Sequence, residues 1–126
     1  MENPPKIWDA VRRRWLVLTP EEWVRQHLIR LLVERGGVPP GNVSQEYPVA
    51  LSGRDGRPCL LAECKAPDVP LGREVFAQAV RYNSVVAAPY VLITNGLLHC
   101  CSSLDRSTGR YAVVEGLPDL SPFLGI

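Results

Sequence analysis

The stretch that decides the fold is CLLAECK, at residues 59–65. Its first half is apolar on both faces, which predicts a strand buried inside a sheet. The stretch then ends in two charges, Glu63 and Lys65, which project from one face of a strand while Cys64 projects from the other. Opposite charges at the edge of a core cost stability unless they pair with each other or hold a metal ion. This strand end is therefore the candidate functional position, with a plain salt bridge as the alternative interpretation.

The residues before this strand predict a helix followed by a hairpin. Thr19 has the properties of an N-cap, Pro20 suits the first helical turn, and Glu22 completes a capping box. Apolar residues then recur at helical spacing until two glycines end the helix at residues 36–37. Alternating residues over 42–51 predict one strand, which a turn at Asp55-Gly56 connects to the CLLAECK strand.

The residues after the CLLAECK strand predict a second helix over 72–87 and a buried strand over 90–94. Asn95-Gly96 indicates a two-residue hairpin leading into a strand from 97 to 102. Residues 111–115 form a candidate edge strand, and the tail from 116 to 126 is expected to be a loop. Two buried strands joined by a crossover helix run parallel, whereas the hairpins give antiparallel pairs. The prediction is an α/β fold: a mixed β-sheet flanked by helices.

Length and composition narrow the function classes. The 126 residues fit a single domain, and the net charge of +1 excludes a strongly basic coat for nucleic acid. No apolar run approaches the roughly 18 residues that span a membrane, and no secretory signal opens the chain. Four cysteines without a Cys-x-x-Cys pair indicate reduced thiols in a cytoplasmic protein. The arm at residues 1–18 contains an arginine triplet, which either contacts phosphates or forms a solvated face.

Further polar residues accompany the strand end. Gln78 and Tyr82 are four residues apart in the second helix and so share a face. The first helix carries Glu22, for which the capping box is a sufficient structural explanation. Each feature alone is weak evidence for a site. Their combination, in this order along the chain, is more specific.

In this combination the chain resembles the PD-(D/E)xK nuclease superfamily, and more narrowly the N-terminal nuclease domain of type I restriction enzyme R subunits. The similar stretches are WLVLTPEEWVRQ (15–26), LAECKAP (61–67), VFAQAVRYN (75–83) and YVLITNG (90–96). The resemblance implies a restriction-endonuclease-like core in the order α-β-β-β-α-β. It also implies an Mg²⁺- or Mn²⁺-dependent hydrolysis of DNA phosphodiesters. Because the chain has no ATP-binding phosphate loop, translocation along DNA would need a helicase or translocase partner.

The resemblance also implies roles for individual residues. Glu63 and the Cys64 carbonyl would bind the metal ion, and Lys65 would orient or activate the attacking water. Gln78 and Tyr82 would hold the lysine or a DNA phosphate, and Glu22 would be an acid near the metal.

One departure from the family stands out, because its members carry an aspartate on a strand just before the Glu-x-Lys strand. Here that strand is missing, along with a short turn. Three explanations are open: about ten residues are absent from this sequence, catalysis has been lost, or another acid substitutes. We favour the first, because Ser52-Gly53 makes an abrupt join. Asp55 is a poor substitute in its turn, whereas Glu46 is expected opposite Lys65 and is a candidate metal ligand. The alternative function is a non-catalytic module that binds DNA or a partner protein.

Overall fold

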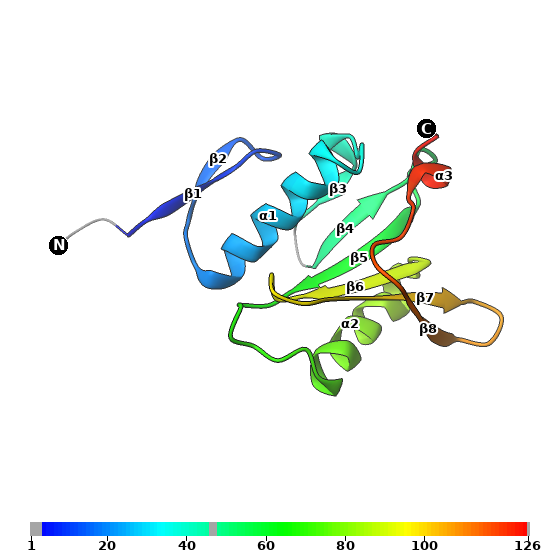
Figure 1. The fold of residues 1–126 in the computed structure, drawn as a ribbon. Helices are drawn as coiled ribbons and strands as arrows, with labels where there is room; N and C mark the ends of the chain where they lie inside the picture. Colours follow the sequence, from blue (N-terminus) through cyan, green and yellow to red (C-terminus); the bar gives the residue numbers. More distant parts are fainter. Residues whose placement is uncertain (1–3, 46–47, 126) are drawn as a thin grey trace.

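A computed structural model describes residues 4–45 and 48–125, which form two sheets and three α-helices (Figure 1). The smaller sheet pairs β1 (Lys6–Asp9) with β2 (Arg14–Val17). The larger sheet contains, in spatial order, β3 (Val43–Ser44), β4 (Val49–Ser52), β5 (Pro58–Cys64), β6 (Tyr90–Thr94), β7 (His99–Asp105) and β8 (Arg110–Val114). The helices are α1 (Pro20–Glu34), α2 (Arg73–Val86) and α3 (Ser121–Leu124), and a 3-10 turn spans Pro40–Asn42. None of the helices in the described ranges is both long and apolar enough to cross a bilayer.

The predicted mixed sheet is confirmed. β5 and β6 run parallel, with Ala62 opposite Leu92, and the other neighbours in the larger sheet are antiparallel. α2 is the crossover helix that the parallel pair requires. This arrangement sets the carboxyl ends of β5 and β6 side by side, with Cys64 paired to Thr94.

Three strands lie between α1 and α2, where the sequence predicted two. Residues 42–51 do not form the single expected strand, because Val43 and Ser44 of β3 pair back onto Leu51 and Ala50 of β4. An alternating pattern cannot reveal such a reversal, since both arms of a hairpin alternate. The element order α1-β3-β4-β5-α2-β6 is therefore the α-β-β-β-α-β order that the resemblance implied.

The larger sheet separates two apolar cores. On one face α1 packs against alternate residues of β5, namely Leu60, Ala62 and Cys64. On the other face α2 packs over Leu61 and its neighbours on β6. Figure 1 shows the two helices on opposite sides of the sheet. Because odd and even residues of β5 face different helices, the direction of Glu63 is set by the same alternation.

Two connections differ from prediction. The turn after β6 has four residues instead of two, because the Asn95 side-chain oxygen accepts hydrogen bonds from the amides of Leu97 (3.0 Å) and Leu98 (2.8 Å). β7 therefore begins at His99 and runs to Asp105. The tail is not entirely loop, because α3 forms there and returns to the sheet. The amide of Arg54 donates to the carbonyl of Phe123 at 2.7 Å, which fixes this return.

The N-terminal arm forms a hairpin, where the sequence predicted one short extended piece packed on the core. In this hairpin Trp8 is paired with Trp15 and Asp9 with Arg14. Its second strand is largely exposed, because 62% of Trp15 and 53% of Val17 is accessible to solvent. The hairpin stands beside the start of α1, separate from the larger sheet (Figure 1).

Candidate functional site at the end of β5

Glu63 and Lys65 occupy the end of β5, as predicted, and form an ion pair. Lys65 Nζ lies 3.3 Å from Glu63 Oε1. Glu63 is 1% exposed, whereas the Lys65 side chain is 19% exposed and reaches the surface. Since Leu61 packs against α2, Glu63 and Lys65 point toward that same face of the sheet.

The Glu63 carboxylate is unusually poor in partners. Within the described part of the chain, neither of its oxygens accepts a well-formed hydrogen bond, although both are buried. Burial raises the pKa of Glu63, and the opposing charge and proximity of Lys65 do not cancel that effect. A buried carboxylate with unused lone pairs costs stability, and such a cost is typical of functional positions.

Cys64 points the other way, as predicted. Its side chain lies in the core beneath α1, and burial raises the pKa of its thiol to about 12. The thiol is therefore neutral and unsuited to metal binding at ordinary pH. Its backbone carbonyl is the atom that the resemblance assigns to the metal.

The first turn of α1 lies close to this strand end. Thr19 caps the helix, and its hydroxyl accepts a hydrogen bond from the amide of Glu22 at 3.0 Å. The Glu22 carboxylate does not complete the predicted capping box but turns to Arg25 and Gln26. Arg25 also pairs with Glu21 at 2.8 Å. Burial raises the pKa of Glu63, and the positive charge of Arg25 lowers it by a smaller amount. Glu22 therefore acts near Glu63 through Arg25 and has no direct contact with it among the described residues.

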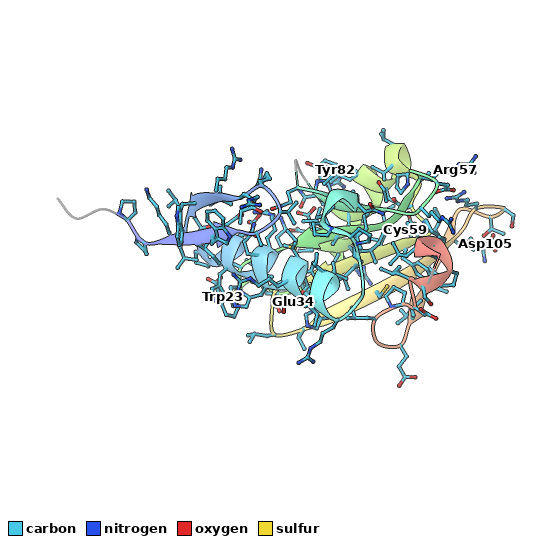
Figure 2. All side chains as sticks on the ribbon, turned by 90° about the horizontal axis from the view of Figure 1, so that it is seen from above. Trp23, Glu34, Arg57, Cys59, Tyr82 and Asp105 are labelled. Atoms are coloured by element: carbon cyan, nitrogen blue, oxygen red, sulfur yellow. The ribbon has the colours of Figure 1, made fainter. Side chains whose placement is uncertain are left out.

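Gln78 and Tyr82 lie on α2, over the face to which Glu63 points. Together with Arg81 they line an open hollow of about 300 Å³, and Tyr82 also packs against the α2-side core. Figure 2 shows Tyr82 well apart from the labelled residues of α1. Within the described ranges no hydrogen bond joins Gln78 to Glu63 or Lys65. The structure thus places the Gln/Tyr pair on the expected face without bringing Gln78 into contact with the charged pair.

The strand beside β5 carries no acid. β4 reads Val-Ala-Leu-Ser, and continuing its pairing with β5 sets Pro48 opposite Glu63. Asp55 lies in the turn and accepts a hydrogen bond from the amide of Arg57, so it remains away from the site. The predicted ligand Glu46 lies outside the described residues. Its expected place opposite Lys65 assumed a strand register in which Val49 is paired with Ala62, and that pair is present.

The oxygen atoms at this strand end fit a hard divalent cation. Mg²⁺ is usually held by one or two carboxylates, with water and phosphate oxygens completing its shell. Glu63 offers two carboxylate oxygens that accept no well-formed hydrogen bond from the described residues, and Lys65 already sets a positive charge beside them. Across residues 4–45 and 48–125, no three His, Cys, Asp or Glu side chains gather as a metal cluster. An ion here would therefore depend on water and phosphate for most of its ligands.

A buried chain of polar side chains was not predicted from the sequence. Gln26 donates to Glu22 at 2.8 Å and to Gln45 at 2.9 Å, and Gln45 in turn donates to the buried Asp9 at 3.0 Å. The chain of contacts connects the N-terminal hairpin to the first turn of α1. Its only sequence signal is the i, i+4 spacing of Glu22 and Gln26, since Gln45 is remote from both partners.

These observations define the class: an α/β domain with a mixed sheet between two helices and one buried carboxylate–lysine pair where its central parallel strand ends. The sequence model of the type I restriction enzyme R protein N terminus (HSDR_N) matches residues 20–118. The chain belongs to that family, as the resemblance indicated. Comparison with curated proteins gave no match, and comparison with solved structures gave none either.

Proposed function

We propose that the chain is a PD-(D/E)xK-type nuclease domain of a type I restriction system, which hydrolyses DNA phosphodiesters with Mg²⁺ or Mn²⁺. The observation that carries the proposal is the Glu63 carboxylate, which is buried at a strand end, accepts no well-formed hydrogen bond from the described residues, and lies 3.3 Å from Lys65 Nζ. A structural salt bridge is expected to satisfy its oxygens with hydrogen bonds. A metal ligand keeps them available for the ion.

Each site residue has its own role in the proposed hydrolysis. Glu63 and the Cys64 carbonyl hold the ion, which when bound supplies an acidified water and polarises the phosphate. Lys65, at the exposed end of the pair, orients the attacking water and offsets negative charge on the phosphate. Gln78 and Tyr82 hold the DNA backbone over α2.

Glu22 contributes through its neighbour. Its carboxylate, with that of Glu21, fixes the Arg25 guanidinium near the end of β5. A fixed guanidinium matches phosphate geometry and needs no reorganisation when DNA arrives. The expected setting is a cytoplasmic restriction complex, in which a helicase or translocase partner moves the DNA.

One observation favours the alternative of a non-catalytic module that binds DNA or a partner protein. Val49 to Ser52 supply no carboxylate beside Glu63, so β4 offers the ion no second acidic side chain. Such a module would retain the fold and its binding surfaces without cutting DNA.

Cleavage of supercoiled plasmid with Mg²⁺, with Mn²⁺ and with EDTA tests the proposal. Wild-type protein should cut with either metal, while Lys65→Ala and Glu63→Gln should be inactive although folded. Glu34→Gln, which removes an exposed carboxylate at the far end of α1, is the matched control and should cut normally. Cutting that persists in Lys65→Ala would contradict the mechanism.

A melting experiment separates the alternatives. An ion at ten times its dissociation constant stabilises the folded protein by about 1.4 kcal/mol, so Mg²⁺ should raise the Tm of wild type but not of Glu63→Gln. Retained DNA binding with neither cleavage nor a metal-dependent Tm would establish the non-catalytic module. A purely structural Glu63–Lys65 pair predicts that the metal does not change the Tm and that Glu63→Gln loses stability.

A further inference from the structure

We propose that the β1–β2 hairpin is a binding arm for single-stranded nucleic acid. This deepens the proposed function by naming the form of the substrate, and its test does not depend on cleavage. Residues 4–18 contain four basic residues and one acid, whereas residues 19–126 contain ten basic and eleven acidic residues. The positive charge of the molecule is thus concentrated on the hairpin, where it can attract a phosphate backbone.

Three of these cations are available for phosphates. Asp9, the one acid, is fully buried and paired with Arg12 at 2.6 Å, so neither of them adds free charge. Lys6, Arg13 and Arg14 are exposed, and their side chains make no ion pair or hydrogen bond within the described part of the chain. Lys6 projects from the same side as Trp8, at the end of β1 away from the turn, whereas Arg13 lies in the turn and Arg14, the partner of Asp9, projects from the other side. The cations therefore flank the hairpin.

The solvent-facing side of the hairpin is aromatic and apolar. Residues paired across two strands share a face, so Trp8 and Trp15 lie on one side together with Lys6 and Val17. The two indole rings meet edge to face, with centroids 5.3 Å apart. Trp15 and Val17 are each more than half exposed, at 62% and 53%. Such exposure of a large ring costs solvation free energy unless a partner covers it.

The hairpin is held in place by its opposite side. Asp9 accepts hydrogen bonds from the amides of Val11 and Arg12, at 3.0 and 2.9 Å, and from the side chain of Gln45 at 3.0 Å. Through Gln26 the same chain of contacts reaches Glu22 at the start of α1. A fixed orientation reduces the entropy lost when a ligand binds. The hairpin is therefore a preorganised surface.

The combination of an open indole with flanking cations favours unpaired bases. In a duplex the faces of the bases are stacked on each other and are not accessible to a side chain lying on a strand. In a single strand each base can stack on an exposed aromatic ring while the backbone follows the positive charges.

Fluorescence anisotropy tests the inference by measuring the affinity of the protein for three labelled probes in EDTA. The probes are oligo-dT, oligo-rU and a DNA duplex made of two separate strands. Trp15→Ala should weaken binding of the single strands roughly 5- to 160-fold, the range for loss of one stacked base. Trp15→Phe should retain most of the affinity. Replacing Arg13 and Arg14 should reduce the salt dependence by about 0.7 in slope for each lost phosphate contact.

The variants are chosen so that the fold survives. Arg13 has a positive φ of 56°, so Arg13→Asn removes the charge while keeping a backbone conformation that asparagine tolerates. Arg14→Gln and the distant control Arg110→Gln complete the set, and circular dichroism verifies each protein. Equal affinity of wild type and Trp15→Ala, or tighter binding of duplex than of either single strand, would overturn the inference.

The outcome is separable from the proposed nuclease function. Glu63→Gln should bind oligo-dT like wild type even though it cannot cut. If that variant binds and no protein cleaves, the binding arm stands and the nuclease proposal fails. If cleavage is normal and the hairpin variants bind like wild type, the arm is wrong and the nuclease proposal stands. Preference for dT or rU then identifies the natural strand.

Discussion

Glu63→Gln is expected to make the folded protein more stable at neutral pH while removing the proposed nuclease activity. The substitution changes the charge of a fully buried group and nearly preserves its volume. In wild type the attraction of Lys65 at 3.3 Å corresponds to about 5 kcal/mol in an effective dielectric of 20. Removing a carboxylate from water also costs several kcal/mol. The attraction and this desolvation cost are of similar size, so the distance alone does not tell whether Glu63→Gln gains or loses stability.

The pKa of Glu63 decides between the two terms. Burial raises that pKa more than Lys65 lowers it, so the ionised form is disfavoured in the folded protein. Glutamine cannot ionise and avoids this cost, and Lys65 can turn to water because part of it is exposed. We expect a gain of about 1–2 kcal/mol, which corresponds to roughly 3–8 °C in Tm for a chain of this size.

The pH dependence provides an internal check. An acid whose pKa is raised on folding stabilises the protein below its unfolded pKa, and that contribution is lost as pH rises through the folded pKa. The advantage of Glu63→Gln over wild type should therefore vanish below the ordinary glutamate value of 4.5 and grow as pH rises from there through the raised pKa of folded Glu63. Urea unfolding across this range, with Glu34→Gln as control, measures it. A loss of stability in Glu63→Gln at neutral pH would refute the reasoning and indicate a structural salt bridge.

Three further changes test the fold around the site. Asp9→Asn should lower the free energy of unfolding, measured in urea, by about 2–4 kcal/mol. The NH2 group of asparagine is a donor and would face the donors that now bind the buried carboxylate. Burial alone would raise the pKa of Asp9, but its hydrogen bonds and Arg12 lower the pKa below 3.8. The difference in stability between wild type and Asp9→Asn should therefore disappear only as pH falls through that lowered pKa. Thr19→Ala should lower stability by about 1 kcal/mol through loss of the N-cap, with Thr19→Ser as the conservative control. Ala87→Gly should stabilise the protein by about 0.5–1 kcal/mol, because Ala87 ends α2 with a φ of 57° that glycine adopts without strain. The Tm should therefore rise, and a lower Tm would contradict this.

Much of the architecture near the site followed from local pattern. The α1 helix begins after Thr19 as its cap and proline predict, and the buried runs at 59–65 and 90–94 form the parallel pair. Alternation along β5 correctly assigned Glu63 and Lys65 to one face and Cys64 to the other. Such predictions succeed because the geometry of one helix or strand relates neighbouring residues directly.

Other features depended on contacts between distant segments. The reversal between β3 and β4, the four-residue turn at Asn95 and the helix in the tail each depend on side chains or partners outside the local pattern. The same holds for Gln45, a residue typical of surfaces, which is buried because Gln26 and Asp9 converge on it.

The sequence by itself determined the two long helices, the parallel pair and the side-by-side projection of Glu63 and Lys65, because these follow from periodicities of two and 3.6 residues. Tertiary structure alone decided that the Glu63 carboxylate is buried and that its oxygens accept no well-formed hydrogen bond from the residues the structure describes. It also decided that the N-terminal arm folds into a hairpin with its indole face outward. Burial and hydrogen bonding depend on which remote segments pack together, and no local pattern encodes that.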